Sequence, residues 1–257
     1  SARHTYARKG QDVVDKNIKA IETGASGIVE VTVDPAWADL QFDKSVKGTT
    51  GEAYFDEHVT PINHLQGQDM PVSAFLKFGV TDGTLKPNVA FEEKRTIATL
   101  VPEWEADKCI QCGKCGFACP HATIRSFLMD EEEVATAQKI ADENNVELTL
   151  KDPSPAYKGA KEANLKFRIQ VSTRNCVGCG VCITVCPTKA LSAADVKTQL
   201  GQEPVAEYLY KHTTYKKEYG NNNTEGGVSL MMPYFEVSGC CPGCGEAPYY
   251  RLASQLF

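Results

Sequence analysis

Eight of the eleven cysteines form two copies of one motif, C-x2-C-x2-C-x3-C-P. The first copy begins at Cys109 and reads C-I-Q-C-G-K-C-G-F-A-C-P, and the second begins at Cys176 and reads C-V-G-C-G-V-C-I-T-V-C-P. This spacing is that of the cysteines that hold the 4Fe–4S clusters of bacterial ferredoxins. Thiolate sulfur is a ligand that such clusters favour. The repeat therefore predicts a chain that carries electrons through two clusters.

In two-cluster ferredoxins, the fourth cysteine of each motif ligates the other cluster. This rule predicts that one cluster is held by Cys109, Cys112, Cys115 and Cys186. It predicts that the other is held by Cys176, Cys179, Cys182 and Cys119. The exchange of ligands would lock the two loops into one pseudo-symmetric unit, with the clusters close enough for direct electron transfer.

The glycines and prolines of the motifs predict how each loop folds. The glycines between the cysteines are Gly113, Gly116, Gly178 and Gly180. Because glycine reaches positive φ at low cost, we expect all four to curl the backbone and bring amide N–H groups to the sulfurs. Pro120 and Pro187 follow the fourth cysteines, and proline suits the first position of a helix. We therefore expect a helix to begin at each fourth cysteine.

Two other kinds of cysteine chemistry fit less well. A disulfide framework suits a small secreted domain, whereas this chain has 257 residues and opens on charged residues instead of a signal segment. Zinc is bound by paired C-x2-C knuckles. A zinc site uses four ligands as two pairs, so the third evenly spaced cysteine and the C-P step would be superfluous.

Composition narrows the class of protein further. The length predicts one or two domains, and 42% hydrophobic with 23% charged residues is ordinary for a globular protein. No apolar run approaches the roughly 20 residues that span a bilayer. The net charge of −6 argues against nucleic acid or an anionic membrane as a partner. Reduced thiolates indicate a reducing compartment, either the cytoplasm or the matrix of a mitochondrion or hydrogenosome-like organelle.

Three cysteines remain, and they lie together in S-G-C-C-P-G-C-G-E near the end of the chain. Two or three thiolates do not complete a four-ligand cluster. The C-x2-C pair Cys241 and Cys244 is therefore either accidental or half of a third site completed by residues beyond Phe257. The stretch from Pro248 begins like a helix and stops without a capping signal, which favours a chain that continues.

The segments before the first motif predict small mixed elements. Residues 7–22 have the spacing of an amphipathic helix, with a stop at Gly24. The alternation over residues 29–33 predicts a half-buried strand. Helix and strand together predict the C-terminal end of an α/β domain over residues 1–47. Residues 48–90 are divided by glycine and proline and predict a small irregular linking domain.

The two motifs predict a ferredoxin-like domain over residues 91–225, and the fold class as a whole is α+β with small α/β pieces flanking that domain. Three elements are expected inside it: a surface helix over 130–145, a strand over 167–171 and a short helix over 192–200. The charged run 92–95 indicates a solvated surface stretch. The asparagine- and glycine-rich residues 221–227 indicate a linker, so residues 226–257 are expected to begin a further domain.

Four segments in this order resemble the pyruvate:ferredoxin (flavodoxin) oxidoreductases, which use thiamine diphosphate to oxidise 2-oxoacids. They are G-Q-D-V-V-D-K-N at 10–17, P-V-S-A-F at 71–75 with D-G-T at 82–84, F-E-E-K-R-T-I-A at 91–98 with V-P-E-W at 101–104, and S-G-C-C-P-G-C-G-E-A-P-Y at 238–249. Together they span the chain, and the ordered set is far more specific than the cysteine repeats. The resemblance identifies residues 226–257 with the start of the thiamine-diphosphate domain.

The resemblance also implies roles for single residues. Cys241 and Cys244 would ligate a third 4Fe–4S cluster, and Glu246 would lie at thiamine diphosphate, which is held with Mg²⁺ in the complete enzyme. Cys240 stands where the family has a small residue, and it receives no role. The E-K-R run at 93–95 would lie in a domain contact. No catalytic residue is predicted within this chain.

The implied partners are coenzyme A, the remaining domains of a homodimeric enzyme, and ferredoxin or flavodoxin as electron acceptor. Two other functions stay open. A stand-alone two-cluster electron carrier fits the motifs, although the long segment before Cys109 and the unfinished C-x2-C argue against it. The same enzyme fused to a flavin reductase would deliver its electrons to NADP.

Overall fold

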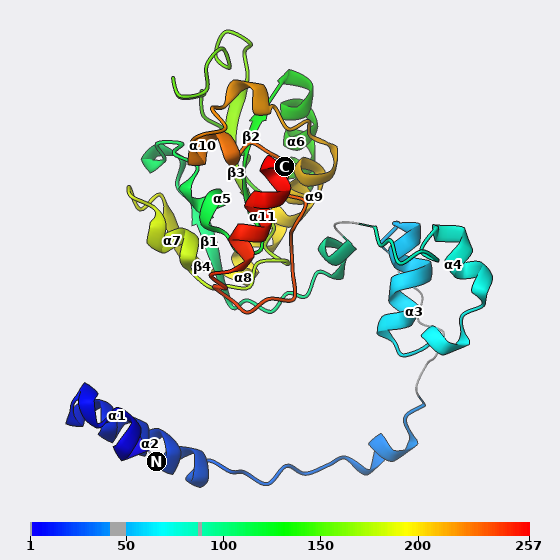
Figure 1. Ribbon diagram of the computed structural model, residues 1–257, viewed down its shortest axis with the longest axis vertical. Coiled ribbons are helices and arrows are strands. Elements are labelled where there is room, and N and C mark those ends of the chain that lie inside the picture. The colour runs from blue at the N-terminus through cyan, green and yellow to red at the C-terminus, as the bar shows by residue number, and fades with distance from the viewer. Residues whose placement is uncertain (1, 42–49, 87–88) are drawn as a thin grey trace. The chain divides into compact units, whose positions relative to one another are not determined.

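The computed structural model describes residues 2–41, 50–86 and 89–257 (Figure 1). The chain forms two compact units, residues 1–46 and 47–257, and the second holds both cysteine motifs. None of the described helices has both the length and the apolar character of a membrane-crossing segment.

The first unit begins with helices. α1 (Ala2–Tyr6) precedes α2 (Gln11–Ser26), whose amphipathic pattern buries Val14. The predicted helix is confirmed, but the predicted stop at Gly24 is wrong. Gly24 keeps the helical conformation, and the cap is Gly27, whose N–H donates to a carbonyl of the last turn.

The strand predicted over residues 29–33 is wrong. The side chains of Val29, Val31 and Val33 are 63–76% exposed, and the segment makes no strand ladder among the described residues of this unit. A β-strand is stable only when its N–H and C=O groups pair with a neighbouring strand, whatever its own alternation. The assignment of residues 1–47 to the end of an α/β domain stays a prediction.

Residues 50–86 contain short helical turns around an aromatic cluster. A π-helical turn (Phe55–Val59) leads into α3 (Thr60–Asn63), and α4 (Val72–Phe78) follows. Tyr54 and His58 stack with ring centroids 5.2 Å apart, and both are buried. The linking domain expected in this region stays a prediction.

The cysteine motifs connect the strands of two small antiparallel sheets (Figure 1). β1 (Leu100–Trp104) pairs with β4 (Leu191–Asp195), and β2 (Ile124–Met129) pairs with β3 (Lys166–Val171). Each motif is therefore preceded by a strand of one sheet and followed by a strand of the other. Together with the helices, this arrangement confirms the α+β, ferredoxin-like class.

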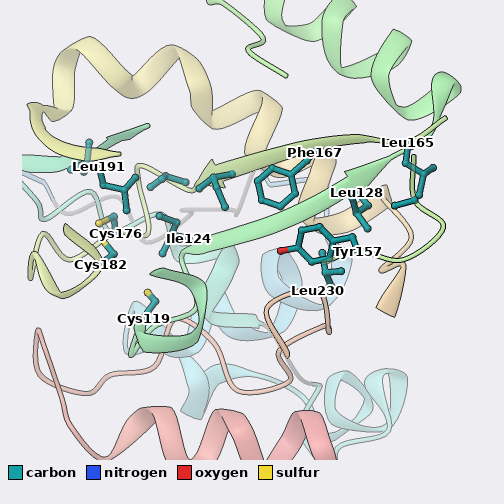
Figure 2. Packing of buried hydrophobic residues seen from close by; sticks show 14 of the residues in the cluster. Cys119, Ile124, Leu128, Tyr157, Leu165, Phe167, Cys176, Cys182, Leu191 and Leu230 are labelled. Atoms are coloured by element: carbon teal, nitrogen blue, oxygen red, sulfur yellow. The ribbon is translucent and has the colours of Figure 1, made fainter. Parts of the chain in front are cut away.

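The main hydrophobic core lies against β2 and β3 (Figure 2). Ile124, Leu128 and Phe167 are at most 2% exposed, and Tyr157 stacks on Phe167 at a centroid distance of 5.6 Å. The same cluster of buried residues contains three thiols, those of Cys119, Cys176 and Cys182. These sulfurs are thus shielded from water by the core itself.

The element predictions near the second motif are confirmed in part. The strand predicted over 167–171 is β3, but its alternate residues Arg168 and Gln170 are buried as well. The helix predicted over 192–200 is wrong in its first half, which forms β4. Pairing with β1 decides the conformation there. The second half is helical as α8 (Val196–Gln199), which the Asp195 side chain caps and which a 3₁₀ turn (Leu200–Gln202) follows.

A second core lies beneath two helices. The predicted surface helix is confirmed as α6 (Glu131–Glu143), which begins with a capping box between Asp130 and Glu133. α9 (Glu203–His212) packs beside it. The buried residues between them and β2 include Phe127, Met129, Ala137, Val205 and Leu209.

The charged run 92–95 is not the solvated stretch that the sequence predicted. Lys94 lies 3.0 Å from a carboxylate oxygen of Glu203 and 3.2 Å from one of Glu207. Glu92 pairs with Lys211 at 2.6 Å. The Lys94 side chain is only 14% exposed, so the run ties its segment to α9.

The linker predicted over residues 221–227 is exposed over its first five residues, and only its end packs tightly. Thr224 caps α10 (Glu225–Val228), and Gly227 and Val228 are buried. Gly227 lies so close to Asn221 that an added Cβ would fall 1.9 Å from its carbonyl oxygen. The domain boundary at 225 and 226 stays a prediction.

Two glycines at equivalent motif positions give a stability test. Gly113 (φ +73°) and Gly180 (φ +74°) both need left-handed backbone, but only at Gly113 would a Cβ meet other atoms, 2.6 Å from Gly226 and from Ser229. Gly180→Ala should cost about 1–2 kcal/mol of unfolding free energy. Gly113→Ala should cost about 1–3 kcal/mol more, because it overpacks the loop. Anaerobic urea unfolding followed by circular dichroism measures both, and equal losses would contradict the packing described.

Candidate iron–sulfur sites

The strand register brings the cysteines of the two motifs together. In one sheet, Ile124 pairs with Val171. Cys119 lies five residues before Ile124, and Cys176 lies five residues after Val171. In the other sheet, Trp104 pairs with Leu191. Cys109 lies five residues after Trp104, and Cys186 lies five residues before Leu191. The fourth cysteine of each motif is therefore placed beside the first cysteine of the other.

One cavity is lined by the first predicted set of four thiols. Its walls include the side chains of Cys109, Cys112, Cys115 and Cys186. Most of the remaining lining is apolar and includes Trp104, Ile169 and Leu191. The structure thus brings together three cysteines of the first motif and the last cysteine of the second.

A second cavity, of about 230 Å³, is lined by the other predicted set. Its thiols are those of Cys119, Cys176, Cys179 and Cys182. Figure 2 shows the Cys119 side chain directed toward Cys176 and Cys182. His121 also lines this cavity, a residue that the sequence analysis did not single out.

The helices of the motifs begin earlier than predicted. α5 (Lys114–Ala118) and α7 (Val181–Val185) start after the left-handed residues Gly113 and Gly180, and they end at the fourth cysteines. A residue before proline avoids the helical conformation, so Cys119 and Cys186 are extended, with ψ of 117° and 111°. The expectation that a helix begins at each fourth cysteine is therefore wrong.

Three of the four predicted glycines have positive φ, and Gly116 does not, because it lies within α5. At the position where the second motif has Gly178, the first motif has Gln111, which adopts a left-handed φ of +59° without being glycine. The side-chain amide of Gln111 holds it there, because its NH₂ group donates to the Asp152 carbonyl and its oxygen accepts from the Ser154 N–H, both at 2.8 Å. No glycine signal in the sequence marks this turn.

Backbone N–H groups point at several of the sulfurs. Gln111 N–H donates to Cys109 Sγ and Gly178 N–H donates to Cys176 Sγ, both at 3.4 Å. Ala190 N–H donates to Cys186 Sγ at 3.2 Å. Such donors stabilise thiolate charge and tune iron–sulfur centres. The donor set of each cavity, four sulfurs with N–H groups behind them, fits a 4Fe–4S cluster.

Burial also governs the acidity of the thiols. It raises the pKa of Cys115 to about 12 and that of Cys176 to about 11, and it raises the pKa of Cys182. Metal binding needs the thiolate and releases its proton, so iron must overcome this cost. Among the described residues, no three His, Cys, Asp or Glu side chains are arranged to hold a single metal ion, and each set of four sulfurs surrounds a cavity instead.

The third cysteine group lies at the start of α11 (Ala247–Leu256). Hydrogen bonds from the N–H groups of Ala247 and Glu246 lower the pKa of Cys244. Cys241 is exposed, and the Cys244 sulfur instead hydrogen-bonds with the Cys240 side chain.

The same segment is fastened to the second cavity. The N–H of Val237 donates to the His121 carbonyl, and the His121 ring donates from Nε2 to the Cys240 carbonyl, both at 2.9 Å. Glu246 is the N-cap residue of α11, and its side chain accepts a hydrogen bond from the Tyr250 hydroxyl at 2.7 Å but makes no capping bond to the helix backbone. The C-x2-C segment therefore lies beside the cavity that contains Cys119.

Comparisons with known proteins agree with this geometry. Residues 108–190 match the 4Fe–4S dicluster domain family. The chain is 38% identical to the pyruvate-flavodoxin oxidoreductase of Enterobacter agglomerans, over 100% of the chain and 21% of that protein. It is 34% identical to the pyruvate:ferredoxin oxidoreductase of Moorella thermoacetica, over 98% of the chain and 20% of that protein. It is also 34% identical to the mitochondrial pyruvate dehydrogenase (NADP+) of Euglena gracilis, over 99% of the chain and 13% of that protein.

Along its whole length the chain is homologous to pyruvate:ferredoxin (flavodoxin) oxidoreductases. It spans about a fifth of the length of the first two relatives, so it corresponds to one segment of those enzymes. The resemblance seen in the four sequence segments is confirmed, and the iron–sulfur assignment of residues 108–190 agrees with the family domain.

The crossed arrangement predicts which single changes are equivalent. Cys119→Ser should remove the same cluster as Cys179→Ser, because both thiols line the second cavity. Cys112→Ser should remove the other cluster, although it is nearer to Cys119 in sequence. Electron paramagnetic resonance of the reduced proteins separates the two residual spectra. If Cys119→Ser matched Cys112→Ser instead, the crossed assignment would be wrong.

Proposed function

We propose that this chain is the electron-transfer segment of an enzyme that oxidises pyruvate with coenzyme A to acetyl-CoA and CO₂. Two 4Fe–4S clusters, each held by one of the crossed sets of four cysteines, would supply the one-electron steps to ferredoxin or flavodoxin. The observation that carries the proposal is the sorting of eight thiols into two cavities, four to each. The names of the relatives support the substrate and the acceptors.

The residues around each cavity support this role because they exclude water. Apolar side chains line the cavities, and Ile124 and Val101 at the second are 1–2% exposed. A dry surrounding lowers the local dielectric and sets the reduction potential of an iron–sulfur centre. Rigid strands on either side hold the thiols in place, so little rearrangement accompanies the arrival or departure of an electron.

A third cluster held in part by Cys241 and Cys244 belongs to the same proposal. The residues fit it in one respect: N–H groups at the start of α11 favour the Cys244 thiolate. We propose that the remaining ligands, thiamine diphosphate and Mg²⁺ are held by other parts of the longer enzyme, with Glu246 near the organic cofactor. Thiamine diphosphate would supply the carbanion chemistry of 2-oxoacid decarboxylation.

One observation favours a second acceptor. The relative from Euglena gracilis carries NADP+ in its name, and this chain covers a smaller share of it, 13%. An enzyme that continues into a flavin reductase would use the same two clusters and deliver their electrons to NADP. A homodimeric enzyme in the cytosol or an organelle matrix is predicted in either case.

The proposal is tested first by composition and then by reduction. The chain purified anaerobically should contain about eight irons and eight sulfides if it binds two cubanes. In the complete enzyme, pyruvate and coenzyme A together should bleach the cluster absorbance and reduce added ferredoxin. Zinc without sulfide would overturn the cluster assignment, and intact clusters that pyruvate does not reduce would overturn the substrate.

The contact between Cys240 and Cys244 makes the third site a sharp prediction. In the complete enzyme, Cys241→Ser or Cys244→Ser should remove one cluster of three and stop electron flow from pyruvate. Cys240→Ala should leave cluster number and turnover unchanged, because the C-x2-C spacing of both full motifs recurs only in the other two cysteines. Iron analysis with stopped-flow reduction measures both. Loss of the third cluster in Cys240→Ala would show that Cys240, and not Cys241, ligates that cluster together with Cys244.

The acceptor surface is predicted from charge. Of the five basic residues that flank the motifs, Arg125 is buried against Glu236 and Lys108 pairs with Glu105, so neither provides free positive charge. The other three, Lys114, Arg174 and Lys189, are exposed. They would attract acidic ferredoxin to a protein whose net charge is −6.

Lys114→Glu should therefore slow ferredoxin reduction most at low salt, where the screening length exceeds about 10 Å. Lys139→Glu, an equal charge change on the exposed side of α6, is the matched control. Stopped-flow rates across a salt series measure the effect. A slowing that does not change with ionic strength would exclude an electrostatic role for Lys114.

A further inference from the structure

Arg251 is a buried cation without an acidic partner. It lies in the middle of α11, and its side chain is among the largest fully buried ones, with 2% exposure. Among the described residues, no carboxylate makes an ion pair with it. Its guanidinium donates to the Phe117 carbonyl and, at 2.9 Å, to the Gln255 side chain, while Nε has no partner. Buried charges in proteins are normally paired.

The surroundings of Arg251 leave one source of negative charge. The ionisable groups in electrostatic reach are Cys119, whose thiolate would attract the guanidinium, and Arg125, which repels it. Arg125 already has its own carboxylate partner, Glu236. The charge that balances Arg251 is therefore expected on the side of Cys119, which lines the second cavity.

The contact with Phe117 fixes the direction of the guanidinium. Phe117 lies in α5, two residues before Cys119, so the hydrogen bond from Arg251 is made to the turn that carries this thiol. Gln255 holds the other side of the group and itself donates to the carbonyls of Val228 and Met231. Arg251 is thus oriented by two partners that carry no charge.

We propose that Arg251 is the counter-charge of the iron–sulfur cluster held by the cavity of Cys119, and that it raises the reduction potential of that cluster. The inference rests on the proposed function. A 4Fe–4S centre with four thiolates is anionic and becomes more so on reduction, so a fixed positive charge nearby stabilises the reduced state. Arg251 undergoes no covalent change; each electron arrives from substrate oxidation and leaves to the acceptor protein.

The test is a potentiometric titration of the complete enzyme, followed by electron paramagnetic resonance. Arg251→Gln removes the charge and keeps a donor for the Phe117 carbonyl. We expect the reduction equilibrium of one cluster to weaken at least tenfold, a fall of about 59 mV for one electron. The affected signal should be the one that Cys119→Ser abolishes, and Arg251→Lys should restore the potential.

Arg174→Gln is the matched control, because it removes the same charge from an exposed position close to Cys176. We expect no shift there. Unchanged potentials in Arg251→Gln with full cluster content, or a shift confined to another cluster, would overturn the proposal. If Arg251→Gln lost the cluster, retention in Arg251→Lys would support a role for charge, and loss in both would overturn it. Absence of the clusters from the unaltered enzyme would instead be a failure of the proposed function.

Discussion

Antiparallel pairing between strands of different motifs is the constraint on which the rest of this structure depends. β2 leaves the first motif and pairs with β3, which enters the second, and β4 leaves the second and pairs with β1. The five-residue offsets that follow place each fourth cysteine among the first three of the other motif. Neither motif is complete alone. A four-sulfur site therefore exists only when both sheets have formed, which would couple the proposed cluster binding to folding.

The C-terminal segment adds a second layer of constraint around the cavity of Cys119. Residues beyond 220 make two hydrogen bonds to His121, and the Arg251 guanidinium binds Phe117. Gly113, which lines the other cavity, packs closely against Gly226. These contacts bring the C-x2-C segment beside the second cavity. On the proposed function, electrons would pass from that segment to the cluster of the second cavity.

Patterns that depend on local chemistry could be predicted from the sequence. The cysteine spacing, the capped helix at 131–143 and the strand at 166–171 carry signals within a few residues. Features set by distant partners could not. β4 is a strand because β1 lies beside it, and Lys94 is largely shielded because it pairs with Glu203. Gln111 takes a glycine-like turn because residues 152 and 154 hold its side chain. The proline after each fourth cysteine ends one helix instead of beginning another.

The central claim, that the two clusters exchange their fourth ligands, is tested most directly by locating the iron. A crystal structure of the anaerobic, cluster-loaded protein, with anomalous differences collected at the iron absorption edge, would show which sulfurs contact each centre. We expect one iron cubane bonded to Cys109, Cys112, Cys115 and Cys186, and a second bonded to Cys176, Cys179, Cys182 and Cys119. A cubane bonded to Cys109, Cys112, Cys115 and Cys119 would contradict the account.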